Sequence, residues 1–317
     1  MEQFFFSASK DFGTEMTRLL DFVRPASVAL WNLRWQVQGF VAAVDDATDD
    51  DLSNRFASGS GFQARNLRRI CVETPWDDQV QQFAQIVAGN VIALFESWAE
   101  KLFLDIGLHN KHHKWVQFPS RGINGRQEKG IRDVIADVHT AGTSSEMRSA
   151  FFPVYASSKR NGSAQLDELI LLYRYHKEIR NAFMHAGGRA SQRTEDAWAA
   201  ASHLTRADVG GRRNPVVTPV TTGQQISYRM EQANDLASVV IRLIHGIDAE
   251  LCYSAYAEEY FLTAWRSWGD AAKYKALPGD PVQRERRIAK ICRKNGFVAP
   301  TDPTAVITLG RRAGLAA

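Results

Sequence analysis

The segment from Arg180 to His185 combines residue types that can act on a phosphodiester. Arg180 and His185 are separated by four residues, and Asn181 directly follows the arginine. An arginine offers a forked, permanently charged set of donors that suits phosphate oxygens, on which negative charge builds up during a reaction. A histidine can take up or release a proton near neutral pH, which typically contributes about 10²–10⁴-fold to a rate. Together these groups can cut RNA without a metal ion.

Such a reaction uses the 2′-hydroxyl of the RNA itself as the nucleophile that attacks the adjacent phosphorus. The expected products carry a 2′,3′-cyclic phosphate and a 5′-hydroxyl. DNA lacks the 2′-hydroxyl and is therefore expected to be inert on this route.

The element that must carry these residues is a helix, predicted over about residues 163–186. Apolar residues recur along it at helical spacing, and Gly187-Gly188 predicts its end. The predicted apolar face comprises Leu166, Leu169, Ile170, Tyr173, Ile179 and Phe183.

Helix geometry constrains how the motif can work. Five positions at about 100° each place Arg180 and His185 roughly 140° apart around a straight helix. Either the helix loosens before Gly187, or two protomers pair so that both motifs line one groove, and we favour the second solution. Asn181 lies four residues before His185, on the same side of the helix, and is expected to orient the imidazole.

The motif and its surroundings resemble those of HEPN domains. Arg180-Asn181 followed by His185 is similar to the signature of that superfamily, an arginine and a histidine separated by four to six residues, and residues 175–179 and 186–188 resemble its usual setting. The upstream aromatic-acidic stretch at residues 95–98 also matches, and the resemblance covers about residues 77–260. It implies a helical bundle, commonly dimeric. It also implies a metal-independent endoribonuclease of phage defence, toxin–antitoxin or CRISPR-linked systems.

The resemblance also implies roles for individual residues. His185 would move protons, Arg180 would bind the scissile phosphate, and Asn181 would place His185. Glu96 and Glu178 are candidate supporting carboxylates, Glu96 as a partner of Arg180. The chain has no tyrosine two residues after His185, which argues against a toxin that is silenced by modification of such a tyrosine. The predicted substrate contacts are Arg189, Arg212, Arg213 and Lys114.

Structural roles would account for the same residues without catalysis. A charged His185 in the last turn would be favoured by the helix dipole. Arg180 would pair with Glu96 or Glu178, and Phe183 and Met184 would belong to the core. The alternative function is therefore a non-catalytic HEPN-type module that binds RNA or a protein partner and regulates an effector. A DNA-binding regulator that uses a basic tail is a third hypothesis.

The remaining pattern predicts an all-α helical bundle with one small β-hairpin near residues 216–222, together with additional amino- and carboxy-terminal helical segments. Pro25 is expected to break the first apolar stretch, residues 13–43, into two helices. Thr74 is the predicted N-cap of a long helix that runs to about Phe103. Further helices are predicted over about residues 195–204, 230–256 and 283–294, the last of them basic, and the final residues are expected to be loosely ordered. We divide the chain into an amino-terminal subdomain (1–73), a HEPN-like domain (74–260) and a basic extension (261–317).

Composition limits the alternatives. The 317 residues carry a formal net charge of +4, which tolerates a polyanionic partner without demanding one. The three cysteines form no Cys-x-x-Cys pair, so a disulfide framework or zinc knuckle is not expected. His109, His112 and His113 are interpreted as a basic or RNA-contacting loop rather than a metal site. The chain is thus expected to be cytoplasmic, with no cofactor, no bound metal and no membrane partner. The expected partners are RNA, a second copy of the chain and an antitoxin or regulatory protein.

Overall fold

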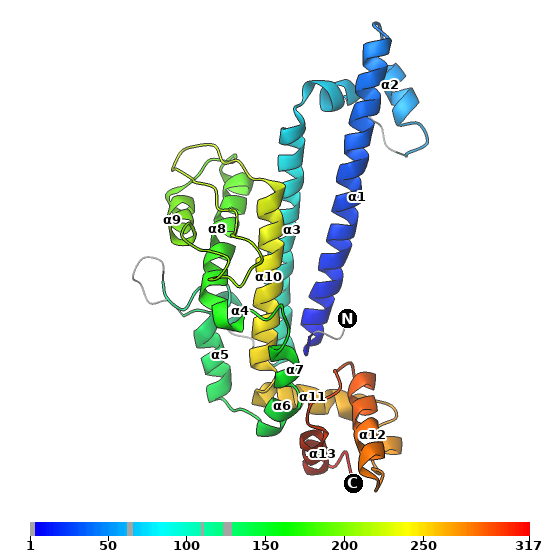
Figure 1. Ribbon diagram of the computed structural model, residues 1–317, viewed down its shortest axis with the longest axis vertical. Coiled ribbons are helices and arrows are strands. Elements are labelled where there is room, and N and C mark those ends of the chain that lie inside the picture. Colours follow the sequence, from blue (N-terminus) through cyan, green and yellow to red (C-terminus); the bar gives the residue numbers. More distant parts are fainter. Residues whose placement is uncertain (1–3, 62–65, 109–110, 123–128) are drawn as a thin grey trace.

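The computed structural model describes residues 4–61, 66–108, 111–122 and 129–317, and this part of the chain is all-α (Figure 1). Within these ranges the extended pairing is limited to two isolated bridges, Thr143 with Ser254 and Arg189 with Gln225. The helices in the first half are α1 (Ser7–Ala43), α2 (Asp49–Phe56), a π-helical turn (Arg69–Glu73), α3 (Trp76–Asp105), α4 (His112–Trp115), α5 (Ile131–Thr140), α6 (Ser145–Ala150) and α7 (Phe152–Ala156). The second half contains a 3₁₀ turn (Ser163–Gln165), α8 (Leu166–His185), α9 (Gln192–Ala201), α10 (Met230–Leu251), α11 (Ala255–Ser267), a 3₁₀ turn (Ala272–Tyr274), α12 (Pro281–Lys294) and α13 (Pro303–Arg312).

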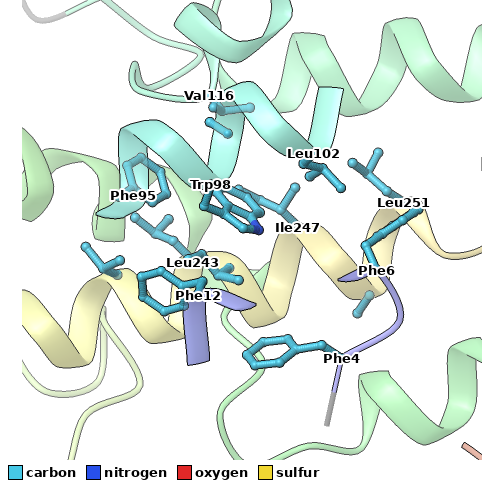
Figure 2. Close-up of a cluster of buried hydrophobic side chains, with 14 of the residues drawn as sticks. Phe4, Phe6, Phe12, Phe95, Trp98, Leu102, Val116, Leu243, Ile247 and Leu251 are labelled. Carbon is cyan, nitrogen blue, oxygen red and sulfur yellow. The ribbon is translucent and has the colours of Figure 1, made fainter. Parts of the chain in front are cut away.

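Three helices, α3, α8 and α10, form the centre of the molecule (Figure 1). Each carries apolar residues at helical spacing, as the sequence predicts, and α10 is buried along most of its length. Figure 2 shows Phe95 and Trp98 of α3 gathered with Leu243 and Ile247 of α10. At Gly246 the chain of α10 passes so close to Ser163 that a side chain would not fit, because a Cβ there would lie 2.7 Å from the Ser163 backbone nitrogen.

The first long helix continues through Pro25, so the predicted break at this residue is wrong. Helix α1 spans 37 residues, and Pro25 is exposed on its surface. The carbonyl that loses its hydrogen bond can therefore be hydrated, and buried residues before and after the proline hold both halves in line. Val23 packs into the core, while Arg34 donates to the carbonyls of Ile70 and Thr74 at 3.1 and 2.7 Å. Packing on both sides outweighs the roughly 3 kcal/mol that an interior proline costs a helix.

The residues that precede α1 are inserted into the core. Phe5 and Phe6 are fully buried, and Figure 2 shows Phe4 and Phe6 beside α10. The backbone N–H groups of Phe5 and Phe6 donate to the carboxylate of Asp248 on α10, at 2.6 and 3.2 Å. Burial raises the pKa of Asp248 to about 6, although these two N–H groups act in the opposite direction. One hydrophobic core thus continues from this segment into α3, α8, α10 and the helices after residue 260.

The carboxy-terminal residues are also packed, so the expectation of a loosely ordered end is wrong. The predicted basic helix is confirmed as α12, with Ile288 and Ile291 buried. Helix α13 follows it, capped by the side chain of Asp302 and buried through Val306 and Leu309. The sequence pattern missed α13 because its short apolar face has no long periodic run around it.

The predicted β-hairpin near residues 216–222 does not form. The segment has no regular secondary structure, and two of its backbone N–H groups bond to side chains of neighbouring helices instead of a second strand. Val216 donates to Asp235 at 2.9 Å, and Thr218 donates to the Tyr175 hydroxyl at 3.0 Å. The predicted cap of α3 also shifts by one residue, because Pro75 takes the N-cap position and the Thr74 hydroxyl donates to the carbonyl of Arg69. None of the described helices is long and apolar enough to cross a membrane.

The buried amino-terminal segment leads to a first prediction. Phe5→Ala should lower the free energy of unfolding by about 3–5 kcal/mol, since it empties a fully enclosed aromatic site. Phe22→Ala on α1 is the matched control, because that ring is 73% exposed, and it should change stability by less than about 0.5 kcal/mol. Urea unfolding followed by circular dichroism measures both. Equal, small losses would mean that residues 4–6 are not part of the core.

Candidate functional site

Helix α8 holds the Arg180–His185 motif in regular α-helical geometry. The helix runs without interruption from Leu166 to His185 and ends where Gly187 adopts a positive φ of 58°. The Gly188 N–H donates to the carbonyl of Ala182 at 3.0 Å and closes the last turn. The alternative in which the helix loosens before Gly187 is therefore wrong. Within one chain, Arg180 and His185 point in directions about 140° apart.

Arg180 lies on the wall of an open groove between α3 and α8. The cavity in this groove has a volume of about 480 Å³. From α3 it is lined by Gln82, Gln85, Ile86, Ala88, Gly89 and Asn90. From α8 it is lined by Ile179, Arg180, Phe183 and Met184, and Tyr228, which lies two residues before α10, completes the lining.

The predicted carboxylate partners of Arg180 bind other cations. Glu96 pairs with Lys177 at 2.7 Å, and Glu178 pairs with Arg174 at 3.2 Å. The Arg180 guanidinium makes one hydrogen bond, from Nη1 to Oδ1 of Asn181 at 3.2 Å, and its buried Nε has no partner among the described residues. The guanidinium of Arg180 therefore has donors left for an anion.

His185 and Asn181 differ in their surroundings from what the sequence suggests. His185 is exposed and is not among the residues that line the groove. The side chain of Asn181 binds Arg180, and in the described part of the chain no hydrogen bond joins it to His185. In this structure Asn181 thus positions the arginine rather than the histidine.

The predicted substrate contacts are dispersed. Arg189 is exposed and donates to the carbonyl of Gly223 at 3.1 Å. Arg213 is paired with Asp235 at 2.8 Å, and Arg212 is exposed beside it. The loop that carries Arg212 and Arg213 begins near the amino-terminal end of α8, because a Cβ at Gly210 would lie 3.3 Å from Oε1 of Gln165. Gln165 precedes Arg180 by fifteen residues, or about 22 Å of helix rise.

The segment around α4 contains the remaining candidates. Lys114 is exposed on α4, three residues before Gln117, whose side chain accepts a hydrogen bond from Lys177 at 2.6 Å. The Nε2 atom of His112 lies 3.8 Å from Oδ2 of Asp137, and its ring stacks near Phe103. His109 lies outside the described residues. The described residues contain no group of three or more His, Cys, Asp or Glu side chains arranged to hold a metal.

Sequence reasoning missed the α3 side of the groove. Gln82, Gln85 and Asn90 are polar residues on the open side of a helix, and such residues are usually solvated without further function. The only available signal is Gly89, because a glycine inside a helix costs about 1 kcal/mol relative to alanine. In the structure Gly89 leaves space in the groove, since a Cβ there would have no atom within 4 Å.

A buried polar network fixes the helix beneath the groove. The Tyr228 hydroxyl lies 2.9 Å from Nδ1 of His176, and the side chain of Gln232 on α10 donates to the Tyr175 hydroxyl at 3.0 Å. The Tyr175 hydroxyl in turn donates to the carbonyl of Thr218 at 3.2 Å. Burial lowers the pKa of His176 to about 3, so this histidine is neutral at physiological pH. The network ties α8 to α10 and to the loop at residues 216–229.

Comparison of the chain with protein-family models, with curated proteins and with solved structures finds no match in any of the three.

The buried histidine generates a second prediction. The pKa of His176 is about 3 in the folded state, below its ordinary value of 6.5, so its stabilising contribution is complete above pH 6.5 and is lost as the pH falls towards 3. His176→Gln keeps a polar partner for Tyr228 but cannot be protonated. Between pH 7 and pH 4 the free energy of unfolding should fall by about 3 kcal/mol less in the variant than in the wild type. Chemical unfolding at several pH values measures this difference. His245 and Asp248 titrate in both proteins, so they do not contribute to the difference between them. If the free energy of unfolding fell equally with pH in both proteins, His176 would not be buried in its neutral form.

Proposed function

We propose that the protein is a metal-independent endoribonuclease of HEPN type. The observation that supports this proposal is the state of Arg180. Arg180 lines an open groove, and among the described residues no carboxylate forms an ion pair with its guanidinium, whereas the neighbouring cations Arg174 and Lys177 are both ion-paired. An unpaired arginine in a groove is suited to a phosphate, and His185 follows it by five residues on the same rigid helix.

In the proposed reaction Arg180 binds the non-bridging oxygens of the scissile phosphate. His185 accepts the proton of the 2′-hydroxyl as its oxygen forms a bond to phosphorus, and the bond from phosphorus to the 5′-oxygen breaks. The 5′-oxygen leaves with a proton that the imidazolium can supply. The products are a 2′,3′-cyclic phosphate and a 5′-hydroxyl, and no water is consumed in this step.

The proposal includes pairing of two copies of the chain. Because α8 stays helical, Arg180 and His185 of one protomer cannot reach the same phosphodiester from one face. Two antiparallel α8 helices would instead set Arg180 of one protomer beside His185 of the other. Met184 lies between the two residues and is 64% exposed, which provides an apolar contact for such an interface.

The biological setting we propose is defence or growth arrest, in the cytoplasm, under control of an antitoxin or other regulatory partner. A non-catalytic module that binds RNA or protein is the second candidate. It is favoured by one observation: in the described residues no hydrogen bond orients the His185 imidazole, although a general base is usually held in place by a partner.

The third prediction tests catalysis. Purified wild-type protein should cleave RNA in the presence of EDTA and leave cyclic phosphate ends, while an all-deoxy substrate stays intact. His185→Ala should lower the rate by about 10²–10⁴-fold, because it removes the proton acceptor. Size-exclusion chromatography of the variant confirms that folding and assembly are unchanged. Uncleaved RNA in the wild-type reaction, together with RNA binding that survives in His185→Ala, would favour the binding module.

The fourth prediction tests the paired site. Arg180→Ala and His185→Ala should each be inactive alone. When they are unfolded and refolded together, half of the dimers are mixed, and each mixed dimer has one intact site. Activity should therefore return to about a quarter of the wild-type value. If both residues act within one chain, mixing restores nothing.

A further inference from the structure

The groove beside Arg180 is lined mainly by side chains that do not belong to the Arg180–His185 motif. Its described lining contains one cation, Arg180, and no carboxylate. Three primary amides, from Gln82, Gln85 and Asn90, lie on the α3 side, and Nδ2 of Asn90 also donates to the carbonyl of Ile86 at 2.8 Å. The apolar side chains of the lining include Phe183 on α8 and Ile86 on α3. Ile86 is 52% exposed. One positive charge, several amides and an aromatic ring suit a flat, polar-edged ligand that carries one anionic group.

A nucleotide has these properties. Its phosphate matches Arg180, its base offers a face that can stack on Phe183, and its edge can hydrogen-bond to amides. The volume of about 480 Å³ falls within the range of roughly 300–1,000 Å³ that is typical of small-molecule sites. A fatty chain would not require three amides, and an acidic peptide would require more than one cation.

The hydrogen-bond donor and acceptor pattern of the amides favours one base. A glutamine or asparagine side chain presents a donor and an acceptor side by side, and this pair matches the adjacent acceptor and donor on adenine. A correct pairing of this kind is worth about 1–3 kcal/mol against a wrong base, which is roughly 5- to 150-fold.

We propose that the groove between α3 and α8 binds one unpaired adenine of the RNA, next to the phosphate that Arg180 holds, and so selects the position of cleavage. The reaction at that phosphate rests on the proposed function, whereas binding of the nucleotide does not. The selecting groups are the amides of Gln82, Gln85 and Asn90.

Gly89 offers a direct way to fill the groove. A Cβ at position 89 would enter open space within the lining, so Gly89→Leu adds volume to the groove and also favours the helix. Gly39 on α1 is the matched control. It too is a helical glycine with open space around its Cβ position, and it lies outside the groove.

The experiment compares wild type, Gly89→Leu and Gly39→Leu in two assays. The first is calorimetric binding of adenosine 3′-monophosphate, of the guanosine, cytidine and uridine analogues, and of a deoxy-substituted oligocytidine that contains a single adenosine. We expect the adenine ligands to bind best. Gly89→Leu should weaken their binding by about ten- to a hundredfold, and Gly39→Leu should leave it unchanged. Tighter binding of the free nucleotide than of the oligonucleotide would overturn RNA as the source of the base.

The second assay maps cleavage positions on an unstructured RNA. Cleavage next to adenosine that becomes slow and indiscriminate in Gly89→Leu supports the inference. Cleavage without base preference, unaffected by Gly89→Leu, overturns the inference while the ribonuclease proposal stands. Adenine binding that Gly89→Leu abolishes, in a protein that cleaves no RNA, supports the groove as a base site and rejects the ribonuclease.

Discussion

The burial of α10 along most of its length is the constraint on which the other elements depend. An unpaired buried polar group costs about 1–3 kcal/mol, so polar residues that point from α10 into the bundle are stabilised by partners on neighbouring segments. Gln232 binds Tyr175 of α8, Asp235 binds the loop at residues 213–216, and Asp248 binds the backbone of Phe5 and Phe6. These three polar residues of α10 thus fix three different segments at different positions along the helix. The bundle is held in register by these contacts and consolidated by the apolar face.

The candidate site is a consequence of this arrangement. Tyr175 and the His176–Tyr228 pair tie α8 to α10 and to the loop before it. One turn further along the same side of α8, Ile179 and Arg180 line the groove towards α3. Around Phe95 of α3, large residues close the contact between α3 and α8, and the rings of Phe95 and Tyr173 have centroids 4.7 Å apart. Nearer the amino-terminal end of α3, Ala88 and Gly89 are small, and the contact opens into the groove. The position of the groove is thus set by residue size on α3, and its charge is set by one residue of α8.

Much of the fold, but less of the site, could be predicted from the sequence. The three central helices follow from apolar periodicity, and the end of α8 follows from two glycines, because both signals are local. The continuity of α1 through Pro25 depends on packing at Val23 and Arg34, and the second of these binds carbonyls 36 and 40 residues further along the chain. Ion pairs were predicted poorly for the same reason. Glu96 and Glu178 have several cations within reach in sequence, and only three-dimensional packing assigns them to Lys177 and Arg174.

The contact between Phe5 and Asp248 joins residues 243 positions apart, and this has a consequence for the order of events during synthesis. A ribosome adds about 5–20 residues per second, so residues 4–6 wait for at least ten seconds or so before their partner on α10 is made. Until then three consecutive phenylalanines have no core to enter, and transiently exposed apolar surface of this kind promotes aggregation. The central bundle can complete its packing only when the chain has emerged as far as the end of α10 at Leu251. An activity built on that bundle would therefore be withheld from the nascent chain, close to the ribosome and its RNA.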